Sequence, residues 1–396
     1  MKTKLLFVIE SLICGGAEKS LITLLNLLDY EKYDVSLQLF TYSGEFMKYI
    51  PQEVKLLPLL ESTKRGQENI GQKLCRGHFK ELLAQLRFSF HIRKRSCINN
   101  NDIFRWYWND WGNKISPLTE NYDVAIAYGQ RLPTFYVAYK VNAKRKLAWI
   151  NIIPQWSKQN AAFLAPAYEH FDKVVCVSAA SQKASCEQLH IPEEKTKIVT
   201  DIVDPDMIVR MADEVPEYNL DLSRPMILTV ARLDYACKGY DISLEAAKIL
   251  RDRGVDFVWY ALGKGNCHDE MKAYISENHL EDYFIMLGST PNPYPYFKRC
   301  TIYAQTSRYE GYGISIAEAR LLNRPVVCTE FGSVWKQMIN GKNGIVVPID
   351  AKAVADSIQQ LLYDSHLYNH IQEFQQSEKK GNVEEINIIY SLFNKR

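Results

Sequence analysis

Residues 305–329 are Gln-Thr-Ser-Arg-Tyr-Glu-Gly-Tyr-Gly-Ile-Ser-Ile-Ala-Glu-Ala-Arg-Leu-Leu-Asn-Arg-Pro-Val-Val-Cys-Thr. The pattern predicts the end of a strand, a Gly-Tyr-Gly loop, a helix, and a new strand from Pro325. A glycine loop that leads into a helix presents unpaired N–H groups and the positive end of the helix dipole to an anion. Glu310 precedes this loop and Glu318 follows it, roughly 12 Å apart at helical rise. Two carboxylates around an anion-binding loop suit a ligand as long as a nucleotide-sugar.

A second polar loop is predicted after the strand at 227–231. The segment 229–241 is Thr-Val-Ala-Arg-Leu-Asp-Tyr-Ala-Cys-Lys-Gly-Tyr-Asp, which places Arg232 and Lys238 on a loop closed by Gly239. Ligands of open α/β sheets bind at the carboxyl ends of strands. Two cations there can straddle a diphosphate and stabilise its charge as it leaves. The alternative interpretation is a pair of solvated surface cations on a turn.

Three further blocks follow the same order along the chain as those of a known family. They are Gly15-Gly-Ala-Glu18, Ala261-Leu-Gly-Lys-Gly265, and Leu287-Gly288 followed by Asn292-Pro-Tyr-Pro-Tyr296. With the two segments above, they resemble the retaining glycosyltransferase family 4 (group 1 glycosyltransferases) of the bacterial polysaccharide-biosynthesis type. The resemblance is strong over residues 225–350 and weak over 40–170. It implies the α/β fold called GT-B, in which two doubly wound Rossmann-like domains face each other across a cleft.

The resemblance also implies roles for individual residues. The catalytic groups are expected to be Glu310, Arg232 and Lys238, with Glu310 beside the donor hexose and the two cations on the diphosphate. Glu318 is expected to bind the ribose hydroxyls, although a carboxylate there could also simply stabilise the helix end. The remaining donor contacts are expected from backbone groups of two glycine loops, at Gly15, Gly16, Gly311, Tyr312, Gly313 and Ile314.

One position departs from the family pattern. Many members carry a histidine directly after the Trp149-Ile150 pair, whereas this chain has Asn151. An asparagine side chain hydrogen-bonds but does not exchange a proton at neutral pH. The change therefore bears on the donor-sugar contacts there, and not on a retaining mechanism in which the leaving phosphate takes the acceptor proton.

Length and composition predict a two-domain globular protein. The chain has 396 residues, with 47% hydrophobic and 24% charged residues. We predict a first domain at 1–203, a linker at 204–224, a second domain at 225–377, and a C-terminal helix within 378–396 that packs back on the first domain. The net charge of +2 implies no bulk attraction to nucleic acid.

The cysteines and the hydropathy pattern predict a cytoplasmic location. The nine cysteines are scattered and include no Cys-x-x-Cys pair, which is typical of reduced thiols. The apolar run Leu5–Ile9 is too short for a signal peptide and predicts a buried strand instead. No apolar run of about 18 residues is present, so we expect no membrane span.

Alternating strand and helix patterns predict parallel, doubly wound sheets. Strands are expected in both halves of the chain, the last of the first half at 197–203. The segment 76–95 is expected to be helical, 99–117 has no clear pattern, and a helix is expected at 334–339.

A metal site and a cofactor are not expected. The segment Asp204-Pro205-Asp206 is a formal Asp-x-Asp, a triplet that other glycosyltransferases use for a divalent metal. Here it falls in the predicted linker, and the family that the chain resembles is metal-independent. The expected small-molecule partner is a nucleotide-sugar, with UDP as the nucleotide.

A basic and aromatic segment in the first half has two interpretations. Residues 76–95 carry six Lys or Arg and one acid, Glu81, interleaved with Phe79, Phe88 and Phe90. The segment could contact an anionic membrane surface, or it could be a solvated helix face. The aromatic cluster Trp106-Tyr107-Trp108 and Trp111 could bind sugar or lipid, or could pack as a small core.

The sequence thus predicts a retaining hexosyltransferase. We expect it to move a hexose or N-acetylhexosamine from a UDP-sugar to a glycan or lipid-linked acceptor, in the cytoplasm or at the inner face of the membrane. Two other interpretations remain: a catalytically inactive partner protein with the same fold, and a nucleotide-sugar epimerase of the GT-B type.

Overall fold

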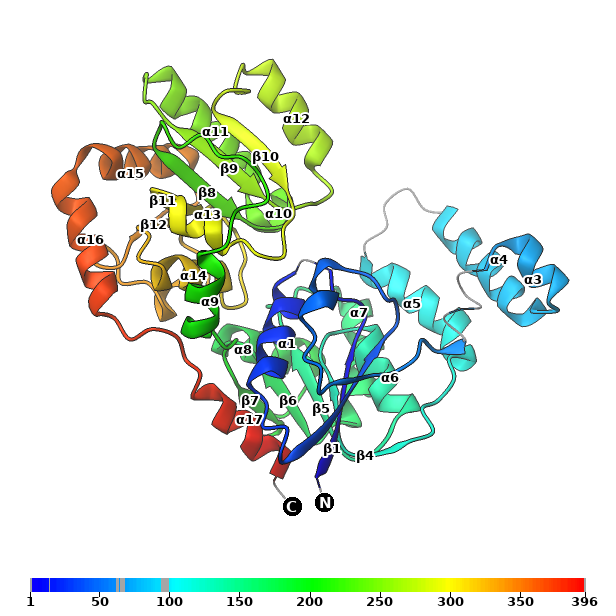
Figure 1. Cartoon of the computed structure of the whole chain (residues 1–396). Coiled ribbons are helices and arrows are strands. Elements are labelled where there is room, and N and C mark those ends of the chain that lie inside the picture. The colour runs from blue at the N-terminus through cyan, green and yellow to red at the C-terminus, as the bar shows by residue number, and fades with distance from the viewer. Residues whose placement is uncertain (1, 14, 62–63, 65–67, 94–99, 395–396) are drawn as a thin grey trace. The chain divides into compact units, whose positions relative to one another are not determined.

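The computed structural model describes residues 2–13, 15–61, 64, 68–93 and 100–394. The chain forms two compact units (Figure 1). The first contains the residues up to Ile13, Ala17–Thr200 and the segment from Ile386, and the second contains Gly15, Gly16 and Asp201–Glu385. Lys94 and Arg95 of the predicted basic segment lie outside the described residues, as do Cys14 and Cys97. The other seven cysteines are free thiols.

The first unit is built on a seven-stranded parallel sheet in the order β3-β2-β1-β4-β5-β6-β7. The interior strand β1 is buried from Leu5 to Ile9 and pairs with β2 and β4 at once, which is why it has no polar alternation. The strands are β1 (Thr3–Ile9), β2 (Tyr33–Leu39), β3 (Lys55–Leu56), β4 (Asn121–Ala127), β5 (Asn142–Ile150), β6 (Lys173–Cys176) and β7 (Thr196–Ile198).

Helices connect these strands and cover the sheet. Two of them start at serine N-caps, because the Ser157 and Ser178 hydroxyls accept a hydrogen bond from the backbone three residues on. The helices are α1 (Gly16–Leu27), α3 (Ile70–Cys75), α4 (Phe79–Arg93), α5 (Asn100–Trp111), α6 (Leu132–Lys140), α7 (Lys158–Glu169), α8 (Ala179–Leu189) and α17 (Glu385–Asn394), with 3₁₀ turns η1 (Glu45–Tyr49), η2 (Gly112–Lys114) and η3 (Glu193–Lys195).

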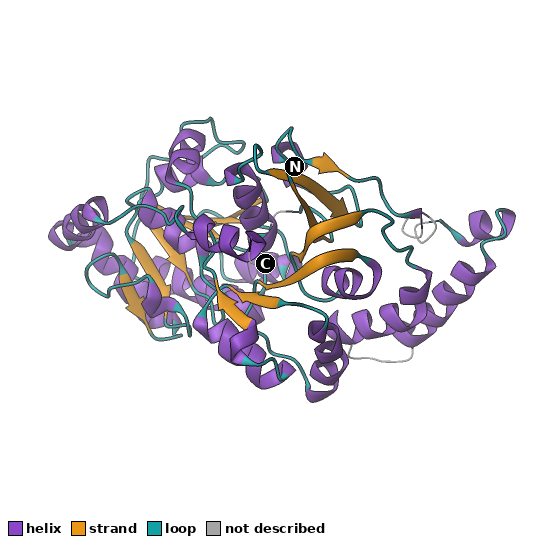
Figure 2. Cartoon of the chain, turned by 90° about the horizontal axis from the view of Figure 1, so that it is seen from below, coloured by secondary structure: helices purple, strands orange, loops and turns teal. Residues whose placement is uncertain are grey.

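The second unit is built on a six-stranded parallel sheet in the order β10-β9-β8-β11-β12-β13. Its strands are β8 (Met226–Val230), β9 (Val258–Leu262), β10 (Phe284–Gly288), β11 (Ile302–Gln305), β12 (Val326–Thr329) and β13 (Ile345–Val347). Its helices are α9 (Pro205–Ala212), α10 (Tyr235–Lys238), α11 (Tyr240–Asp252), α12 (His268–Glu277), α13 (Tyr294–Arg299), α14 (Ile314–Leu321), α15 (Ala351–Tyr363) and α16 (Ser365–Ser377), with the turn η4 (Val334–Lys336). Figure 2 shows the strands of each sheet with helices around them.

Two predicted elements are shorter in the structure, and side-chain hydrogen bonds explain both. The strand expected at 197–203 ends at Ile198, because the Asn382 side chain bonds the backbone of Asp201 and Val203. The helix expected at 334–339 is only the turn η4, because Asn343 bonds the backbone of Gln337 and Ile339 instead. Helix α9 lies within the stretch 204–224 that the sequence marks as linker.

Helix α17 returns to the first unit, as the predicted fold requires. The ring of Phe393 packs edge-on against Phe7 of β1 at 6.3 Å and against Tyr33 of β2 at 5.6 Å. Tyr390 stacks on Tyr33 at 5.4 Å, and its hydroxyl donates to the carbonyl oxygen of Leu27. Residues near both ends of the sequence therefore share one core. Within the described residues, no helix is long and apolar enough to cross a membrane.

Replacing the ring that closes this core is expected to destabilise the first unit selectively. Phe393 is 4% exposed, so we predict that Phe393→Ala lowers the unfolding free energy of the first unit by about 3–5 kcal/mol. Hydrogen exchange followed by mass spectrometry should show lost protection in peptides from β1 and β2, and little change in peptides from β8 and β9. The exposed Asn387→Ala on the same helix is the control. Unchanged protection in β1 and β2 would contradict the assignment.

Candidate functional site

The candidate site lies where the strand order of the second sheet reverses. Strand β8 has β9 on one side and β11 on the other, so the chain leaves the carboxyl ends of β8 and β11 in opposite directions. Such a switch point leaves a crevice where α/β proteins bind ligands. Arg232 follows β8 by two residues, and Glu310 follows β11 by five. The topology thus brings together two segments far apart in sequence.

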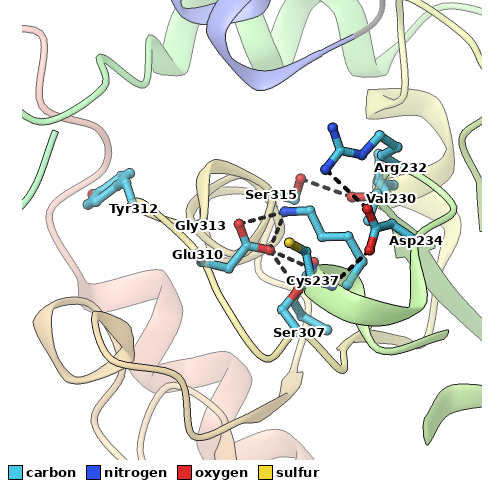
Figure 3. Close-up of polar contacts among 12 residues, drawn as sticks. Val230, Arg232, Asp234, Cys237, Ser307, Glu310, Tyr312, Gly313 and Ser315 are labelled. Atoms are coloured by element: carbon cyan, nitrogen blue, oxygen red, sulfur yellow. Dashed lines mark hydrogen bonds and ion pairs between the residues drawn. The ribbon is translucent and has the colours of Figure 1, made fainter. Parts of the chain in front are cut away.

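A bidentate ion pair joins these two segments. Lys238 Nζ donates to both carboxylate oxygens of Glu310, each at 2.7 Å. The side chains are 21% and 11% exposed, respectively, so the pair is only partly screened by water. Two of the three predicted catalytic residues therefore hold each other in place in this structure (Figure 3).

The Glu310 carboxylate has further hydrogen-bond donors from the end of β11. Its Oε1 accepts from Ser307 Oγ at 2.7 Å and from Gln305 Nε2 at 3.0 Å. Ser333 Oγ donates to the Glu310 carbonyl oxygen at 3.1 Å. A carboxylate with this many donors stays fixed even if Lys238 turns to another partner.

Arg232 lies at the more exposed side of the same cluster. Its side chain is 63% exposed, and Nη2 approaches Asp234 Oδ2 at 3.3 Å. The other Asp234 oxygen accepts from the Cys237 backbone N–H at 2.8 Å and so caps the short helix α10. Asp234 therefore orders both the loop that carries Arg232 and the turn that carries Lys238.

Glycines allow the loops around the site to touch. Gly239 has a φ of +65°, and a Cβ there would lie 2.1 Å from the carbonyl oxygen of Thr306. A Cβ at Gly263 or Gly265 would lie about as close to the backbone of the 231–233 loop. Only glycine permits such close backbone contacts. These contacts explain why glycine occupies positions 239, 263 and 265. They hold the loop that carries Arg232 and Lys238 against its neighbours.

The glycine loop leads into α14, as the sequence predicts. Gly313 has a φ of +84° and precedes the first helical residue, Ile314, so no side chain caps this helix start. Gln337 Nε2 donates to the Gly313 carbonyl oxygen at 3.3 Å, and Ser315 Oγ donates to the Val230 carbonyl oxygen at 3.2 Å. The helix start is thereby tied to the end of β8. Figure 3 shows the Tyr312 side chain on the far side of Glu310 from Arg232.

Glu318 lies on the buried side of α14. It is 1% exposed, and its Oε1 accepts from the Tyr294 hydroxyl at 3.0 Å. Tyr294 belongs to the Asn-Pro-Tyr-Pro-Tyr block that the sequence marks only as a strand-and-turn motif. In the structure this block also has a role at the candidate site, because its Tyr294 donates a hydrogen bond to the predicted ligand-binding carboxylate of Glu318.

The remaining predicted residues have simpler surroundings. Gly15 precedes α1 and Gly16 is its first residue, and both follow β1 where the strand order of the first sheet reverses between β1 and β4. Both polar atoms of the Asn151 side chain are buried with no hydrogen-bond partner among the described residues. Asp204 caps α9 by accepting from the backbone of Asp206 and Met207.

The sequence missed three groups that position the predicted ones, Ser307, Asp234 and Tyr294, and it missed the Cys237 thiol of the same loop. Burial, and next the charge of Asp234, raises the pKa of Cys237, so this thiol is protonated at neutral pH and is no nucleophile. The available signal was the polar run Gln305-Thr306-Ser307 after a buried strand. No set of three metal-binding side chains gathers within the described part of the chain.

Curated relatives match about half of this chain. A Campylobacter jejuni N-acetylgalactosamine-N,N'-diacetylbacillosaminyl-diphospho-undecaprenol 4-alpha-N-acetylgalactosaminyltransferase is 26% identical over 210 residues, 52% of this chain and 55% of that protein. An alpha-D-kanosaminyltransferase of Streptomyces kanamyceticus is 27% identical over 229 residues, 56% of this chain and 57% of that protein. The chain thus spans little more than half the length of these relatives.

Solved structures match the whole chain. Anabaena HepE in complex with UDP and glucose has a TM-score of 0.71 at 19% identity and covers 100% of both chains. A Staphylococcus aureus TarM mutant in complex with Fondaparinux, alpha-GlcNAc-glycerol and UDP has a TM-score of 0.70 at 14% identity and covers 99% of this chain and 100% of that chain. The family model described as glycosyl transferases group 1 matches residues 211–378. The chain therefore has the GT-B fold, and its residues 211–378 are similar to the group 1 glycosyl transferases.

Proposed function

We propose that this protein is a retaining glycosyltransferase that moves a hexose or N-acetylhexosamine from a UDP-sugar to a glycan or lipid-linked acceptor. The main support is the cluster of Arg232, Lys238 and Glu310 at the switch point of a domain similar to the group 1 glycosyl transferases. HepE and TarM were solved with UDP, and the name of the Campylobacter relative includes a diphospho-undecaprenol. These likenesses support both the nucleotide and the acceptor class.

The local geometry suits a diphosphate held between two loops. The exposed Arg232 and the adjacent Lys238 supply positive charge from the loop after β8, and the N–H groups at the start of α14 supply hydrogen-bond donors. In this proposal Lys238 turns from Glu310 to the diphosphate when the donor binds. Ser307 and Gln305 then keep Glu310 in place to receive the hydroxyl groups of the sugar.

The proposed reaction needs no base from the protein. The bond between the anomeric carbon and the diphosphate oxygen breaks, and a bond to the acceptor oxygen forms on the same face of the sugar. The acceptor proton passes to the leaving phosphate oxygen, so glycosylated acceptor and UDP are the products. Arg232 and Lys238 stabilise the charge that grows on the diphosphate. We also propose that the reaction uses no metal, since Asp204 is occupied in capping α9.

A donor panel tests the proposed function directly. We expect slow hydrolysis of a UDP-sugar, in preference to GDP- and ADP-sugars, that continues in EDTA because the two cations replace a metal. Product chromatography for free sugar and nucleotide is the measurement. An inactive partner protein would turn over none of the donors, and an epimerase would interconvert a nucleotide-sugar without releasing UDP. Activity lost in EDTA and restored by Mn²⁺ or Mg²⁺ would contradict metal independence.

Both cations should be needed for turnover. We predict that Arg232→Ala and Lys238→Ala each lower kcat by about 100-fold or more, because each removes a preorganised charge on the leaving group. Lys272→Ala, an exposed lysine on α12, is the control and should keep full activity. Lys238→Ala alone leaves the Glu310 carboxylate without its cation. The double variant Lys238→Ala/Glu310→Gln removes that negative charge as well, and we expect it to remain slow. Recovery of activity in it would mean that Lys238 acts only as the partner of Glu310.

The two carboxylates should differ in what they affect. We predict that Glu318→Gln weakens UDP binding by about 1.5–3 kcal/mol, as loss of a charged hydrogen-bond partner does. Glu310→Gln should lower turnover without weakening UDP binding, because it leaves Lys238 free for the diphosphate. Calorimetric titration of UDP measures both, and Tyr294→Phe should reproduce part of the Glu318 effect. Equal UDP affinity in Glu318→Gln and the unchanged protein would rule out the ribose assignment.

A further inference from the structure

Helices α3 and α4 project from the first unit and stand clear of its sheet (Figures 1 and 2). Residues on one side of this pair pack against α5. Phe88 of α4 contacts Tyr107 of α5 edge-on at 6.0 Å, and Ala84 is buried on the same side. Lys73 of α3 donates to Gln85 Oε1 at 2.7 Å and lies 5.9 Å from the ring of Trp111. These contacts fix which face of α4 points outward.

The outward face of α4 is apolar. It carries Phe79, Leu83, Leu86 and Phe90, which are 58%, 62%, 50% and 60% exposed. Their spacing of four, three and four residues places them in one stripe along the helix. Ile70 and Leu74 of α3 add two more exposed apolar side chains one helical turn apart. A gathering of this kind on a projecting element marks an interaction surface.

The charges on the same face identify the partner. Lys80 and Arg87 are also exposed, and they lie one turn from Leu83 on either side. The segment 70–95 has seven Lys or Arg and one acid in its sequence. Contact with a second copy through this surface would bring like charges together. An anionic bilayer satisfies both properties, because it takes apolar side chains into the interface and attracts the cations at the phosphate level.

We propose that the outer face of α3 and α4 docks this protein on an anionic membrane. The four apolar side chains of α4 enter the boundary between headgroups and acyl chains. Lys80 and Arg87 keep their aliphatic stems on that boundary and place their charges at the lipid phosphates. This inference rests on the proposed function, since it places the enzyme where a lipid-linked acceptor would be.

Vesicle binding tests the proposal with the full chain. The probes are vesicles of phosphatidylcholine alone or mixed with phosphatidylglycerol, and co-sedimentation measures the bound fraction. We expect binding to the mixed vesicles that Leu83→Ser/Leu86→Ser lowers about tenfold or more, at low and high salt alike. Lys80→Ser/Arg87→Ser should lower it about tenfold at low salt and less at high salt. The control Val215→Ser/Tyr363→Ser, which removes exposed apolar side chains of the second unit, should bind like the unchanged protein.

Two results would overturn the proposal. One is no binding of the unchanged protein to the mixed vesicles, and the other is equal binding by Leu83→Ser/Leu86→Ser. Gel filtration that showed a dimer lost in this variant, without vesicle binding, would assign the face to a second copy. Donor hydrolysis in solution separates this proposal from the proposed function. The rate of donor hydrolysis should be the same in Leu83→Ser/Leu86→Ser as in the unchanged protein. If the unchanged protein binds vesicles but hydrolyses no donor, the proposed function is wrong and the membrane proposal stands.

Discussion

The ion pair between Lys238 and Glu310 joins the two halves of the second sheet at the point where ligands can enter. Taking both charges partly out of water costs free energy, which the two charged hydrogen bonds and the donors from Ser307 and Gln305 offset. The pair also requires that the loops after β8 and β11 touch, which fixes glycine at 239. A bound diphosphate would compete with Glu310 for the same lysine, so the donors from Ser307 and Gln305 would have to stabilise the carboxylate that Lys238 leaves.

Both units use one layout, with different residues at the point where strand order reverses. In the second sheet that point carries the charged cluster, and in the first sheet β1 is followed there by the two glycines at the start of α1. The first unit differs further because its core includes α17 and its periphery includes α3 and α4. Each of the two units is built on a parallel sheet, whereas α3, α4 and α17 are additions to the first.

The sequence predicted the parallel strands and the positions of Arg232, Lys238 and Glu310 at loops after them, because buried strands are continuous apolar runs and the loops follow a family pattern. It did not predict β13, α15 or α16, and it left α5 unassigned. The hydrogen bond between Tyr294 and Glu318 links elements 24 residues apart, and periodicity carries no such information. For α4, the sequence indicated a basic helix with interleaved phenylalanines, but only packing against α5 shows which side remains exposed.

The contact between Phe7 and Phe393 makes the first unit discontinuous in sequence, and this bears on how the chain folds during synthesis. The ribosome synthesises Asp201–Glu385 before it synthesises the rest of α17, whose Phe393 completes the core of the first unit. Until then, the apolar surface of β1 and β2 that Phe393 covers is exposed to chaperones and to other chains. The stretch Asp201–Glu385, which makes up nearly all of the second unit, is continuous in sequence and has no such delay. Strands β1 and β2 are thus made before the second unit but complete their core after it.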